Sequence, residues 1–543
     1  MAAVVGVVAR QARVTIEFEV DGEAIAPNRE VEAVSADPAV LSHWGPWLPG
    51  FIREAMLSSS DRHRTGIHHT APNLADAVLA VACTAAAPFD VHTTVADPAV
   101  GGGVFLLAAA EMMAGPRDEV VGRLMGCDID PLAVAATRAA LTLWSGGTVP
   151  LPGNVVVADF LDEDPFPKAP DLILGNPPFL SQLRGDTIRT EETRTRIATR
   201  WSGVGRYVDG AAAFLLASAD AVAADGTVAL IQPDSVLSAL DARPVRARLA
   251  GVAPPAAIWV DDKRRFDAAV DTIAVVCRRG VNSTDVGLWS GVPASLDAHH
   301  QGGLSPDSWA PYLAIQRGVP TLPELAGGRT LGEVANVTAG FRDQFYGLRD
   351  AVADSPDAAV QLITSGLIDP LVNGWGSRPC RFDQRRWSHP GVDLDRVAPA
   401  IKHWVADRLR PKVLVASQTR VIEAIVDPRG GLLPCTPVIS VEPGPDAPSL
   451  WHIAALLTCP VATARLVQVS TGSALSADAV RVSAARLSTL PLPDELSLWD
   501  EAASRAEAGD VIATGELMMA AHRLADRTDL LAWWTERLPA PKG

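Results

Sequence analysis

Closely spaced cysteines are missing from this sequence. Its six cysteines form no C-x-x-C pair and lie far apart, at Cys83, Cys127, Cys277, Cys380, Cys435 and Cys459. Structural zinc sites and disulfide frameworks depend on such spacing, so we expect neither a metal site nor disulfides. A reducing, cytoplasmic compartment fits this cysteine usage.

Long apolar runs are absent as well. No run of eighteen apolar residues occurs, since even the alanine-rich stretch 211–224 is broken by Ser218 and Asp220. The first charged residue is Arg10, so no basic segment precedes the short apolar start. The sequence therefore predicts neither a membrane span nor a signal peptide.

Positive charge is scarce. The chain has 47 Lys and Arg against 63 Asp and Glu, a formal net charge of −16. Because phosphate contact depends mainly on Lys and Arg, any nucleic-acid interface must be local. Hydrophobic residues make up 48% and charged residues 20%, as in a folded globular protein. A chain of 543 residues exceeds what one core usually organises, which predicts two or three domains.

Apolar runs of two kinds alternate in the first half of the chain. Between about residues 64 and 279, short strand-like runs alternate with helical runs rich in Ala and Leu, which predicts βαβ units around a mostly parallel, Rossmann-like sheet. Strands are expected at 91–95, 120–127, 155–157, 172–174, 227–231 and 272–277. Further on, we expect strands at 413–416 and 438–441 and a helix at 450–466, as in an α+β domain.

The same patterns divide the chain into five segments. We find no chemistry in the first of them, although residues 13–20 are a candidate strand. The predicted segments are an N-terminal extension (1–60), an α/β domain (61–285), a linker rich in Gly, Pro and Ser (286–329), an α+β domain (330–495) and a helical tail (496–543).

A glycine-rich turn follows the first strand of the α/β domain. It reads Asp97-Pro98-Ala99-Val100-Gly101-Gly102-Gly103-Val104-Phe105-Leu106, and its glycines let the backbone turn tightly and approach a ligand. The G-x-G-x-x-G spacing of dinucleotide enzymes is absent, because Leu106 stands where the last glycine would fall. A nicotinamide cofactor is therefore disfavoured. Taken alone, the loop could also be a structural turn.

Acidic residues follow the next two predicted strands. Asp128 stands at a strand end, where a carboxylate can hold a ribose diol. Asp159 follows the next strand and offers an acceptor for an adenine amine, and the adjacent Phe160 offers a ring to cover the adenine face. An Asp at such a position is also a common helix or turn cap. Three acidic strand ends in succession favour a ligand site.

The strand expected at 172–174 ends in Gly175-Asn176-Pro177-Pro178-Phe179. The exocyclic amine of a nucleobase is a poor nucleophile, because its lone pair is delocalised into the ring. Its activation needs hydrogen-bond acceptors, which Asn176 and the Pro177 carbonyl can supply. Phe179 can stack on a base that has been flipped out of a duplex. The motif thus indicates positioning and electrostatic catalysis without a covalent intermediate.

Asn176 to Phe179 resembles the catalytic motif of amino-methyltransferases, and Asp97 to Leu106 resembles their Asp-Pro-x-x-Gly-x-Gly-x-Phe-Leu cofactor loop. Upstream, Thr65 to Pro72 is similar to a segment that closes over the methionine end of the cofactor in the gamma class of N6-adenine DNA methyltransferases. Thr70 and Pro72 match that segment, whereas its usual Tyr is missing. The cofactor loop also departs from the family pattern, with Val100 where Cys is usual and Gly102 where Ser is usual.

This resemblance implies S-adenosylmethionine as cofactor and a role for each matching residue. It places the methionine end near Thr70, Pro72, Asp97, Pro98, Ala99, Gly101 and Gly103, the ribose and adenine near Asp128 and Ile129, and the adenine also near Asp159 and Phe160. A later motif, Arg265 to Thr272, carries an aromatic that stacks on the other face of the target base in the family, and Phe266 is the matching residue. A core aromatic is an equal alternative for Phe266.

The second region looks like the target-recognition domains that follow gamma-class catalytic domains. Between Arg378 and Arg420 the sequence has ten Lys and Arg against four Asp. DNA contacts are expected from Arg378, Arg381, Arg385, Arg386 and Lys412. A charge-rich stretch can also be an ordinary solvated face.

The resemblance therefore predicts an adenine-specific DNA methyltransferase that flips its target base. Its expected partners are double-stranded DNA and proteins of a restriction or defence system. Transfer to N4 of cytosine, to an RNA base or to a protein amide remains an alternative, as does a non-catalytic subunit that binds DNA or partners. A C5-cytosine enzyme needs a cysteine nucleophile after proline, but Pro379-Cys380 and Pro434-Cys435 lie far downstream of the predicted sheet.

Overall fold

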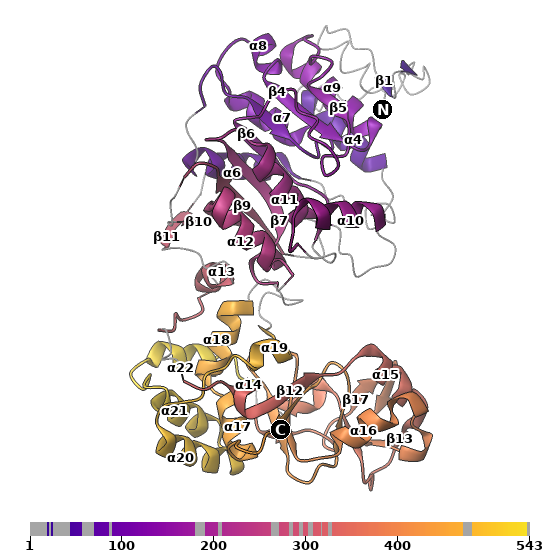
Figure 1. The fold of residues 1–543 in the computed structure, drawn as a ribbon, viewed down its shortest axis with the longest axis vertical. Coiled ribbons are helices and arrows are strands. Elements are labelled where there is room, and N and C mark those ends of the chain that lie inside the picture. Colours follow the sequence, from indigo (N-terminus) through magenta and orange to yellow (C-terminus); the bar gives the residue numbers. More distant parts are fainter. Residues whose placement is uncertain are drawn as a thin grey trace. The chain divides into compact units, whose positions relative to one another are not determined.

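A nine-stranded sheet forms the centre of the first of two units, Met1–Trp309 (Figure 1). Its strand order is β11-β10-β8-β9-β7-β6-β3-β4-β5. β9 is antiparallel to β7 and β8, and β11 is antiparallel to β10, whereas the other neighbouring pairs are parallel. The strands are β3 (Val95–Asp97), β4 (Leu124–Asp128), β5 (Val155–Val157), β6 (Leu172–Gly175), β7 (Thr227–Pro233), β8 (Pro255–Val260), β9 (Thr272–Arg278), β10 (Val286–Ser290) and β11 (Asp297–Gln301).

The computed structural model describes most, but not all, of the chain. The described residues are 19–20, 23–24, 44–56, 70–85, 89–179, 191–204, 209–239, 241–261, 271–281, 286–292, 297–301, 308–316, 318–323, 328–470 and 480–539. The predicted strand at 13–20 falls largely outside them, apart from the end of β1 (Glu19–Val20), which pairs with β2 (Glu23–Ala24).

Helices pack against the sheet of the first unit. α7 packs on β3 and β4, α9 on β4 and β5, α6 on β7, β8 and β9, and α11 on β7. All seven residues of β7 are buried, as in a mostly parallel sheet covered by helices. The helices are α4 (Leu48–Met56), α6 (Pro72–Ala85), α7 (Val104–Met112), α8 (Arg117–Val121), α9 (Pro131–Ser145), α10 (Glu191–Arg200), α11 (Gly210–Ala221) and α12 (Arg243–Val252), with 3₁₀ turns η1 (Gly45–Trp47) and η2 (Asp234–Leu237).

The sequence around α9 explains why a helix begins and ends there. Asp130 is its N-cap and accepts a hydrogen bond from the Leu132 amide at 2.9 Å, and Pro131 occupies the first helical position. Gly146 ends the helix with a φ of 79°, a left-handed conformation that glycine adopts without strain. These local signals fix the start of α9 directly behind Asp128.

Two of the predicted boundaries differ from the structure. The linker expected at 286–329 is not one segment, because β10 and β11 extend the catalytic sheet and α13 (Ala310–Gln316) belongs to the second unit. Val286 and Leu288 are buried, so the run VGLWS is an ordinary strand next to β8. The segment expected as an extension also packs on the domain, since α4 lies against α9.

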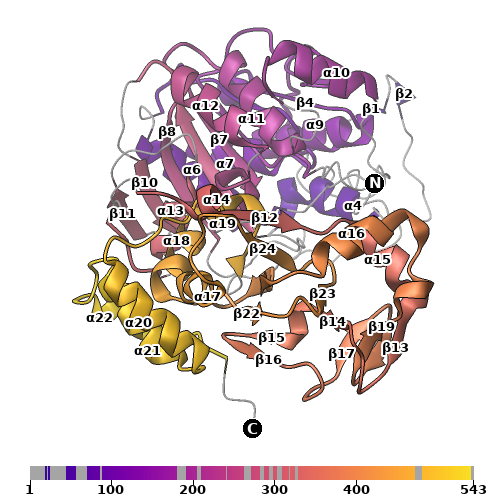
Figure 2. The ribbon, with the colours of Figure 1, turned by 60° about the horizontal axis from the view of Figure 1, so that its bottom comes forward.

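The second unit, Ala310–Gly543, contains two four-stranded sheets (Figure 2). One has the order β12-β24-β20-β22 and the other β13-β19-β14-β23. The strands of the two sheets are β12 (Ala335–Ala339), β24 (Ile439–Pro443), β20 (Lys412–Val415), β22 (Ala424–Asp427), β13 (Val352–Asp354), β19 (Pro390–Val392), β14 (Gln361–Ile363) and β23 (Leu432–Pro434). Two-stranded pairs are β15 (Ile368–Asp369) with β16 (Val372–Asn373), β17 (Cys380–Phe382) with β18 (Arg385–Trp387), and β21 (Gln418–Thr419) with β25 (Val480–Arg481).

The C-terminal helices share a core with the first of these sheets. Trp499, Trp533 and Trp534 are buried together with Val413 and Val441, so residues 496–543 are part of this unit and not a separate tail. The helices are α14 (Leu331–Val334), α15 (Arg342–Leu348), α16 (Lys402–Arg408), α17 (Leu450–Leu457), α18 (Pro460–Ser470), α19 (Ala484–Leu487), α20 (Leu496–Glu507), α21 (Val511–Ala521) and α22 (Thr528–Thr535), with 3₁₀ turns η4 (Arg349–Ala351), η5 (Ser365–Leu367), η6 (Leu394–Arg396) and η7 (Pro399–Ile401).

The predicted fold class is confirmed: a mixed, mostly parallel Rossmann-like sheet is followed by an α+β unit. Among the described residues, no single helix has the length and apolarity of a membrane span, and only α17 and α18 reach them as a pair, bent by 55°.

Candidate active site

The candidate site lies where the direction of the sheet reverses. β3 has β4 on one side and β6 on the other, so the chain passes from β5 back across β3 to continue at β6 and β7. Ligands of such sheets bind outside the carboxyl ends of the strands at this switch point. Asp97 is the last residue of β3, and Asn176 follows the last residue of β6. The structure thus brings the two predicted motifs to one edge.

The predicted cofactor loop bends around two carboxylates. The amide of Ala99 donates to Asp97 Oδ1 at 2.9 Å, and the amide of Gly101 donates to Asp128 Oδ2 at 2.9 Å. Gly101 and Gly103 have φ angles of 52° and 82°, which side chains other than glycine rarely adopt. The loop therefore presents bare backbone beside Asp97 and Asp128 and ends directly in α7.

Asp97 is the most strongly perturbed acid of the site. It is 1% exposed, and its Oδ2 has no hydrogen-bond partner among the described residues. Burial raises the pKa of Asp97 to about 8; the Ala99 amide opposes this rise, and the charge of Asp128 adds to it. A cationic ligand group would satisfy Oδ2 and restore its charge. The methionine end of S-adenosylmethionine carries an ammonium, so Asp97 fits the implied cofactor.

We expect Asp97→Asn to make the ligand-free protein more stable at pH 8 and to weaken cofactor binding. Between the ordinary pKa of 3.8 and about 8, the unfolded chain loses a proton that folded Asp97 keeps, so wild-type stability falls as pH rises across this window. The amide removes this loss, which should raise Tm at pH 8 by about 3 °C or more. Thermal scans from pH 5 to pH 8 measure it, with Asp118→Asn on exposed α8 as control. A lower Tm than wild type at pH 8 would contradict the buried, protonated state.

Asp128 and Ile129 lie at the end of β4, as the resemblance implies. The Asp128 carboxylate accepts the Gly101 amide and also the Asp130 amide, at 3.0 Å to Oδ1. Burial raises the pKa of Asp128, while the charge of Arg53 opposes this rise. Ile129 is 64% exposed, an unusual exposure for an isoleucine beside a buried carboxylate. An apolar surface next to an acceptor suits a nucleoside.

Asp159 and Phe160 are placed differently from each other. Asp159 follows β5, and its Oδ1 accepts the Leu161 amide at 3.0 Å, the turn-capping role that was the alternative for this residue. The Phe160 ring is 2% exposed and packs against Phe166 and Phe214, with ring centroids 5.3 and 6.0 Å apart. Phe160 therefore has little ring surface left for a ligand, and its contact with a cofactor stays a prediction.

The upstream segment meets the catalytic motif. Nδ2 of Asn176 donates to Oγ1 of Thr70 at 3.0 Å, although the two residues are 106 positions apart in sequence. Thr70 is 5% exposed, and Pro72 begins α6 directly behind it. Pro177 is buried, whereas Pro178 and Phe179 are half-buried. Phe266 lies outside the described residues, so its predicted stacking role stays a prediction.

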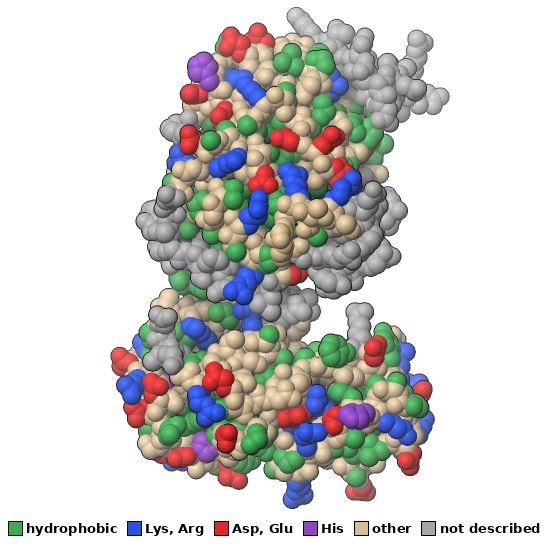
Figure 3. Space-filling model, viewed as in Figure 1, with side chains coloured by type: hydrophobic (Ala, Val, Ile, Leu, Met, Phe, Trp, Pro, Cys, Tyr) green, Lys and Arg blue, Asp and Glu red, His purple; other side chains and the backbone are tan. Residues whose placement is uncertain are grey.

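The expected DNA-binding residues separate into two groups. Arg381, Arg385 and Arg386 are exposed on the β17–β18 hairpin, and among the described residues none of them forms an ion pair. Arg378 is paired with Asp369 through a short contact, and its side chain is 19% exposed. Figure 3 shows charges of both signs mixed over the face in view, consistent with a local interface.

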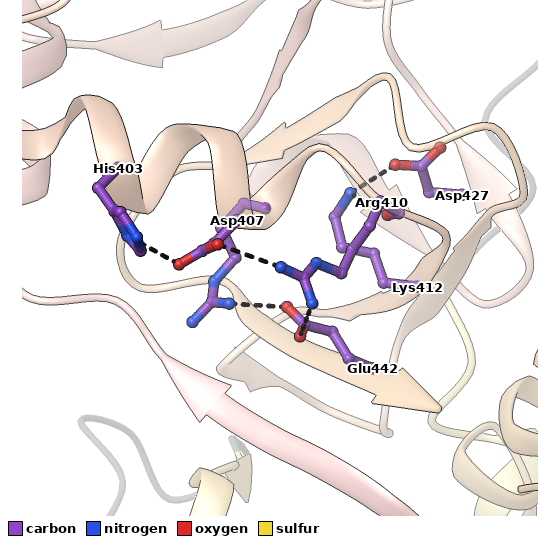
Figure 4. Close-up of polar contacts among 7 residues, drawn as sticks. His403, Asp407, Arg410, Lys412, Asp427 and Glu442 are labelled. Atoms are coloured by element: carbon purple, nitrogen blue, oxygen red, sulfur yellow. Dashed lines mark hydrogen bonds and ion pairs between the residues drawn. The ribbon is translucent and has the colours of Figure 1, made fainter. Parts of the chain in front are cut away.

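Lys412 does not fit the predicted DNA contact. Its side chain is fully buried, and Nζ lies 2.6 Å from Asp427 Oδ2 (Figure 4). A buried lysine needs such a counter-charge, because removing an ammonium from water is costly. The prediction is corrected: Lys412 is a structural residue of the second unit. Much of the nearby charge is neutralised too, since Arg408 and Arg410 pair with Glu442 at 2.7 and 3.9 Å.

One residue of the site was missed by the sequence reasoning. Arg53 of α4 is 4% exposed and forms an ion pair with Asp130, at 2.7 Å between Nη2 and Oδ2. The only sequence signal is weak: Arg53 stands four positions after Pro49, so both lie on one helix face, and both are buried. A charged residue on the buried face of an amphipathic helix points to a hidden partner.

Three comparisons relate this geometry to known proteins. A family model described as N-6 DNA methylase matches residues 56–249, which include Thr70, the cofactor loop and Asn176 to Phe179. No curated protein matches the chain in sequence. The structure is similar to the type IIL restriction-modification enzyme MmeI in complex with DNA, with 13% identity, a TM-score of 0.57, and coverage of 92% of this chain and 80% of MmeI.

The fold also resembles that of the DrdV–DNA complex, with 11% identity and a TM-score of 0.53 over 90% of this chain and 61% of DrdV. At these identities the likeness to both structures is one of fold. S-adenosylmethionine, the cofactor expected from the motifs, is the methyl donor of the N-6 DNA methylases. The resemblance indicated by the motifs is thereby confirmed: residues 56–249 are similar to the N-6 DNA methylases, and the chain shares its fold with a restriction-modification enzyme.

Proposed function

We propose that this chain transfers a methyl group from S-adenosylmethionine to the N6 amine of adenine in double-stranded DNA. The observation that carries the proposal is the Thr70–Asn176 hydrogen bond, 3.0 Å long, beside the buried Asp97 at the switch point. This bond holds the Asn176 amide by its nitrogen. The amide oxygen, which is the acceptor that a base amine needs, therefore points away from Thr70.

Catalysis by these residues depends on acceptors more than on a base. The Asn176 Oδ1 and Pro177 carbonyl oxygens accept the two amine hydrogens and draw the nitrogen out of the ring plane, which makes its lone pair nucleophilic. Pro177 is buried and has a fixed φ, so its carbonyl is pre-oriented. Bound S-adenosylmethionine supplies the electrophilic methyl group, and no protein nucleophile is needed.

The target adenine must leave the duplex to reach these acceptors. Its amine is otherwise paired inside the helix, and base flipping is the general solution for enzymes that act on a base. Phe179 packs against the core of the first unit while staying half-buried, so one part of its ring is anchored and another is accessible for stacking. Phe266 is proposed as a second stacking ring from the resemblance alone.

The cysteines argue against C5-cytosine transfer. Cys380 and Cys435 both belong to the second unit and are buried. Burial raises the pKa of the Cys435 thiol to about 12 and also raises that of Cys380. The nucleophile of such an enzyme is a thiolate, which neither environment favours.

Methyl transfer from labelled cofactor to unmethylated genomic DNA, followed by nucleoside analysis, tests the proposed function. Label in N6-methyladenine supports it. Label in N4-methylcytosine would keep the chemistry and overturn the base assignment. Cofactor binding with no label in DNA would overturn the DNA substrate and point to RNA, protein or a partner-dependent activity.

We propose the β17–β18 hairpin as one DNA contact. Its turn residues Asp383 and Gln384 have φ angles of 47° and 62°, as in the tight type I′ turn of a hairpin. Arg381 lies directly opposite Arg386 in the strand register, and both are exposed. Like charges at such a cross-strand pair are destabilising, and a phosphate between them would relieve the repulsion.

We expect Arg385→Ala/Arg386→Ala to weaken DNA binding for all sequences and to reduce the salt dependence. Each lost phosphate contact lowers the slope of log K against log salt by about 0.9, so the double variant should lose about 2. Titrations of duplex DNA at several salt concentrations measure both effects. Arg505→Ala on exposed α20 is the matched control. An unchanged slope would place the DNA interface elsewhere.

A further inference from the structure

Helix α4 packs directly on the cofactor loop. A Cβ on Gly102 would lie 2.4 Å from the Cα of Gly50, and a Cβ on Gly50 would lie 2.7 Å from the Gly102 carbonyl oxygen. Both distances are shorter than real Cβ contacts, so the two backbones meet with no side chain between them. The loop that bends around Asp97 and Asp128 is therefore covered on one side by α4.

A chain of hydrogen bonds runs from α4 to the loop. Arg53 donates through Nε and Nη2 to Asp130 Oδ2, at 3.1 and 2.7 Å. The Asp130 amide donates to Asp128 Oδ1 at 3.0 Å, and Asp128 Oδ2 accepts the Gly101 amide at 2.9 Å. Each link fixes the next. The side chain of Arg53 thereby orients the carboxylate at the end of β4.

Electrostatics explain why an arginine stands at this buried place. Asp97, Asp128 and Asp130 are the acids that surround the loop among the described residues, and Arg53 is the only cation that these contacts bring to them. A buried guanidinium is costly unless paired, and here two carboxylates offset the cost. In return, its charge favours the ionised form of Asp128 against burial and against the charge of Asp130.

We propose that Arg53 is a positioning residue of the cofactor site, which keeps Asp128 ionised and oriented to accept the two hydroxyl groups of a nucleoside ribose. This inference rests on the proposed function, because it takes the ligand at Asp128 to be the nucleoside of S-adenosylmethionine. It assigns part of the site to α4, a segment that precedes the matched catalytic motifs. A carboxylate must be ionised to accept both hydroxyls of the diol.

Binding of S-adenosylhomocysteine by calorimetry tests the inference without turnover. Arg53→Met removes the charge and keeps an apolar side chain of similar length, and we expect it to weaken binding about tenfold to a hundredfold at pH 6.5. Without Arg53 the pKa of Asp128 rises further, so the affinity ratio of variant to wild type should recover as pH rises to 8.5. The ratio cancels the titration of Asp97, which both proteins share.

Two further variants separate positioning from a structural role. Arg53→Lys keeps the positive charge and should restore most of the affinity at pH 6.5. Arg53→Met combined with Asp128→Asn should lose little more than Asp128→Asn alone, because residues that act through each other are not additive. Arg117→Met on exposed α8 is the control for an arginine lost elsewhere in the unit.

The outcomes distinguish this inference from the proposed function. Weaker binding by Arg53→Met that recovers with pH, together with non-additivity, supports the positioning role. A pH-independent loss, or additive effects, would overturn it in favour of simple packing of α4. Equal binding by wild type and Arg53→Met at every pH would overturn it as well. Failure of wild type itself to bind S-adenosylhomocysteine would instead overturn the proposed function.

Discussion

Asn176→Ala should reduce methyl transfer by about a thousandfold while leaving the affinity for S-adenosylhomocysteine within about threefold. The Asn176 oxygen interacts with the amine hydrogens most strongly as the nitrogen leaves the ring plane, so its loss affects turnover more than binding. Single-turnover transfer to a duplex gives the rate, and calorimetry gives the cofactor affinity. Transfer at the wild-type rate would exclude Asn176 as an acceptor.

Thr70→Val is the matched companion of this variant. It keeps the shape of the side chain and removes the hydroxyl that accepts from Asn176 Nδ2 at 3.0 Å. The Asn176 amide can then rotate, so we expect an intermediate loss of about tenfold to a hundredfold, and Thr70→Ser should recover most of it. If Thr70→Val lowers cofactor affinity and not the rate, Thr70 acts on the cofactor and not on the Asn176 amide.

Lys412→Met should destabilise the second unit by about 3 to 5 kcal/mol, because it leaves the buried charge of Asp427 without its partner. Asp427 also accepts the amides of Gly430, Gly431 and Leu432, at 2.8, 3.1 and 2.9 Å, so the carboxylate cannot turn away. Urea unfolding, followed by the fluorescence of the buried tryptophans of this unit, measures the loss.

Lys412→Met combined with Asp427→Asn is the control for the unpaired charge. The double variant removes the buried carboxylate and keeps an oxygen for the turn amides, so it should be more stable than Lys412→Met alone. At a temperature where the protein is folded, Lys412→Met should leave the salt slope of DNA binding unchanged. A smaller slope would mean that Lys412 does reach phosphate, contrary to its burial.

The strand pattern of the catalytic sheet was predictable because each strand is a short apolar run. The runs at 155–157, 172–174, 227–231 and 272–277 correspond to β5, β6, β7 and β9 within two residues at each end. The run at 120–127 was less clear, since its first residues belong to α8 and only Leu124–Asp128 form β4. Valine fits a buried helix turn as well as a strand, so composition alone could not divide that run.

The helix expected at 450–466 shows the same limit. It is two helices, α17 and α18, which meet at a bend of 55°. Pro460 begins α18, and proline favours the first turn of a helix because it has no amide hydrogen to donate. β10 and β11 were missed for another reason: their segment is rich in Gly, Pro and Ser, and pairing with β8 decides that it is a strand.

The sequence by itself determined the order of the sheet, the glycine-rich loop, the acidic strand ends and the Asn-Pro-Pro-Phe motif, because each of these is written in consecutive residues. Only the tertiary structure decided which charges are free. It pairs Arg53 with Asp130 over 77 positions and buries Lys412 against Asp427, while Arg381, Arg385 and Arg386 stay exposed in the same basic stretch. The physical reason is that the worth of a charge depends on its burial and its partners, and both are set by segments that the chain brings together only on folding.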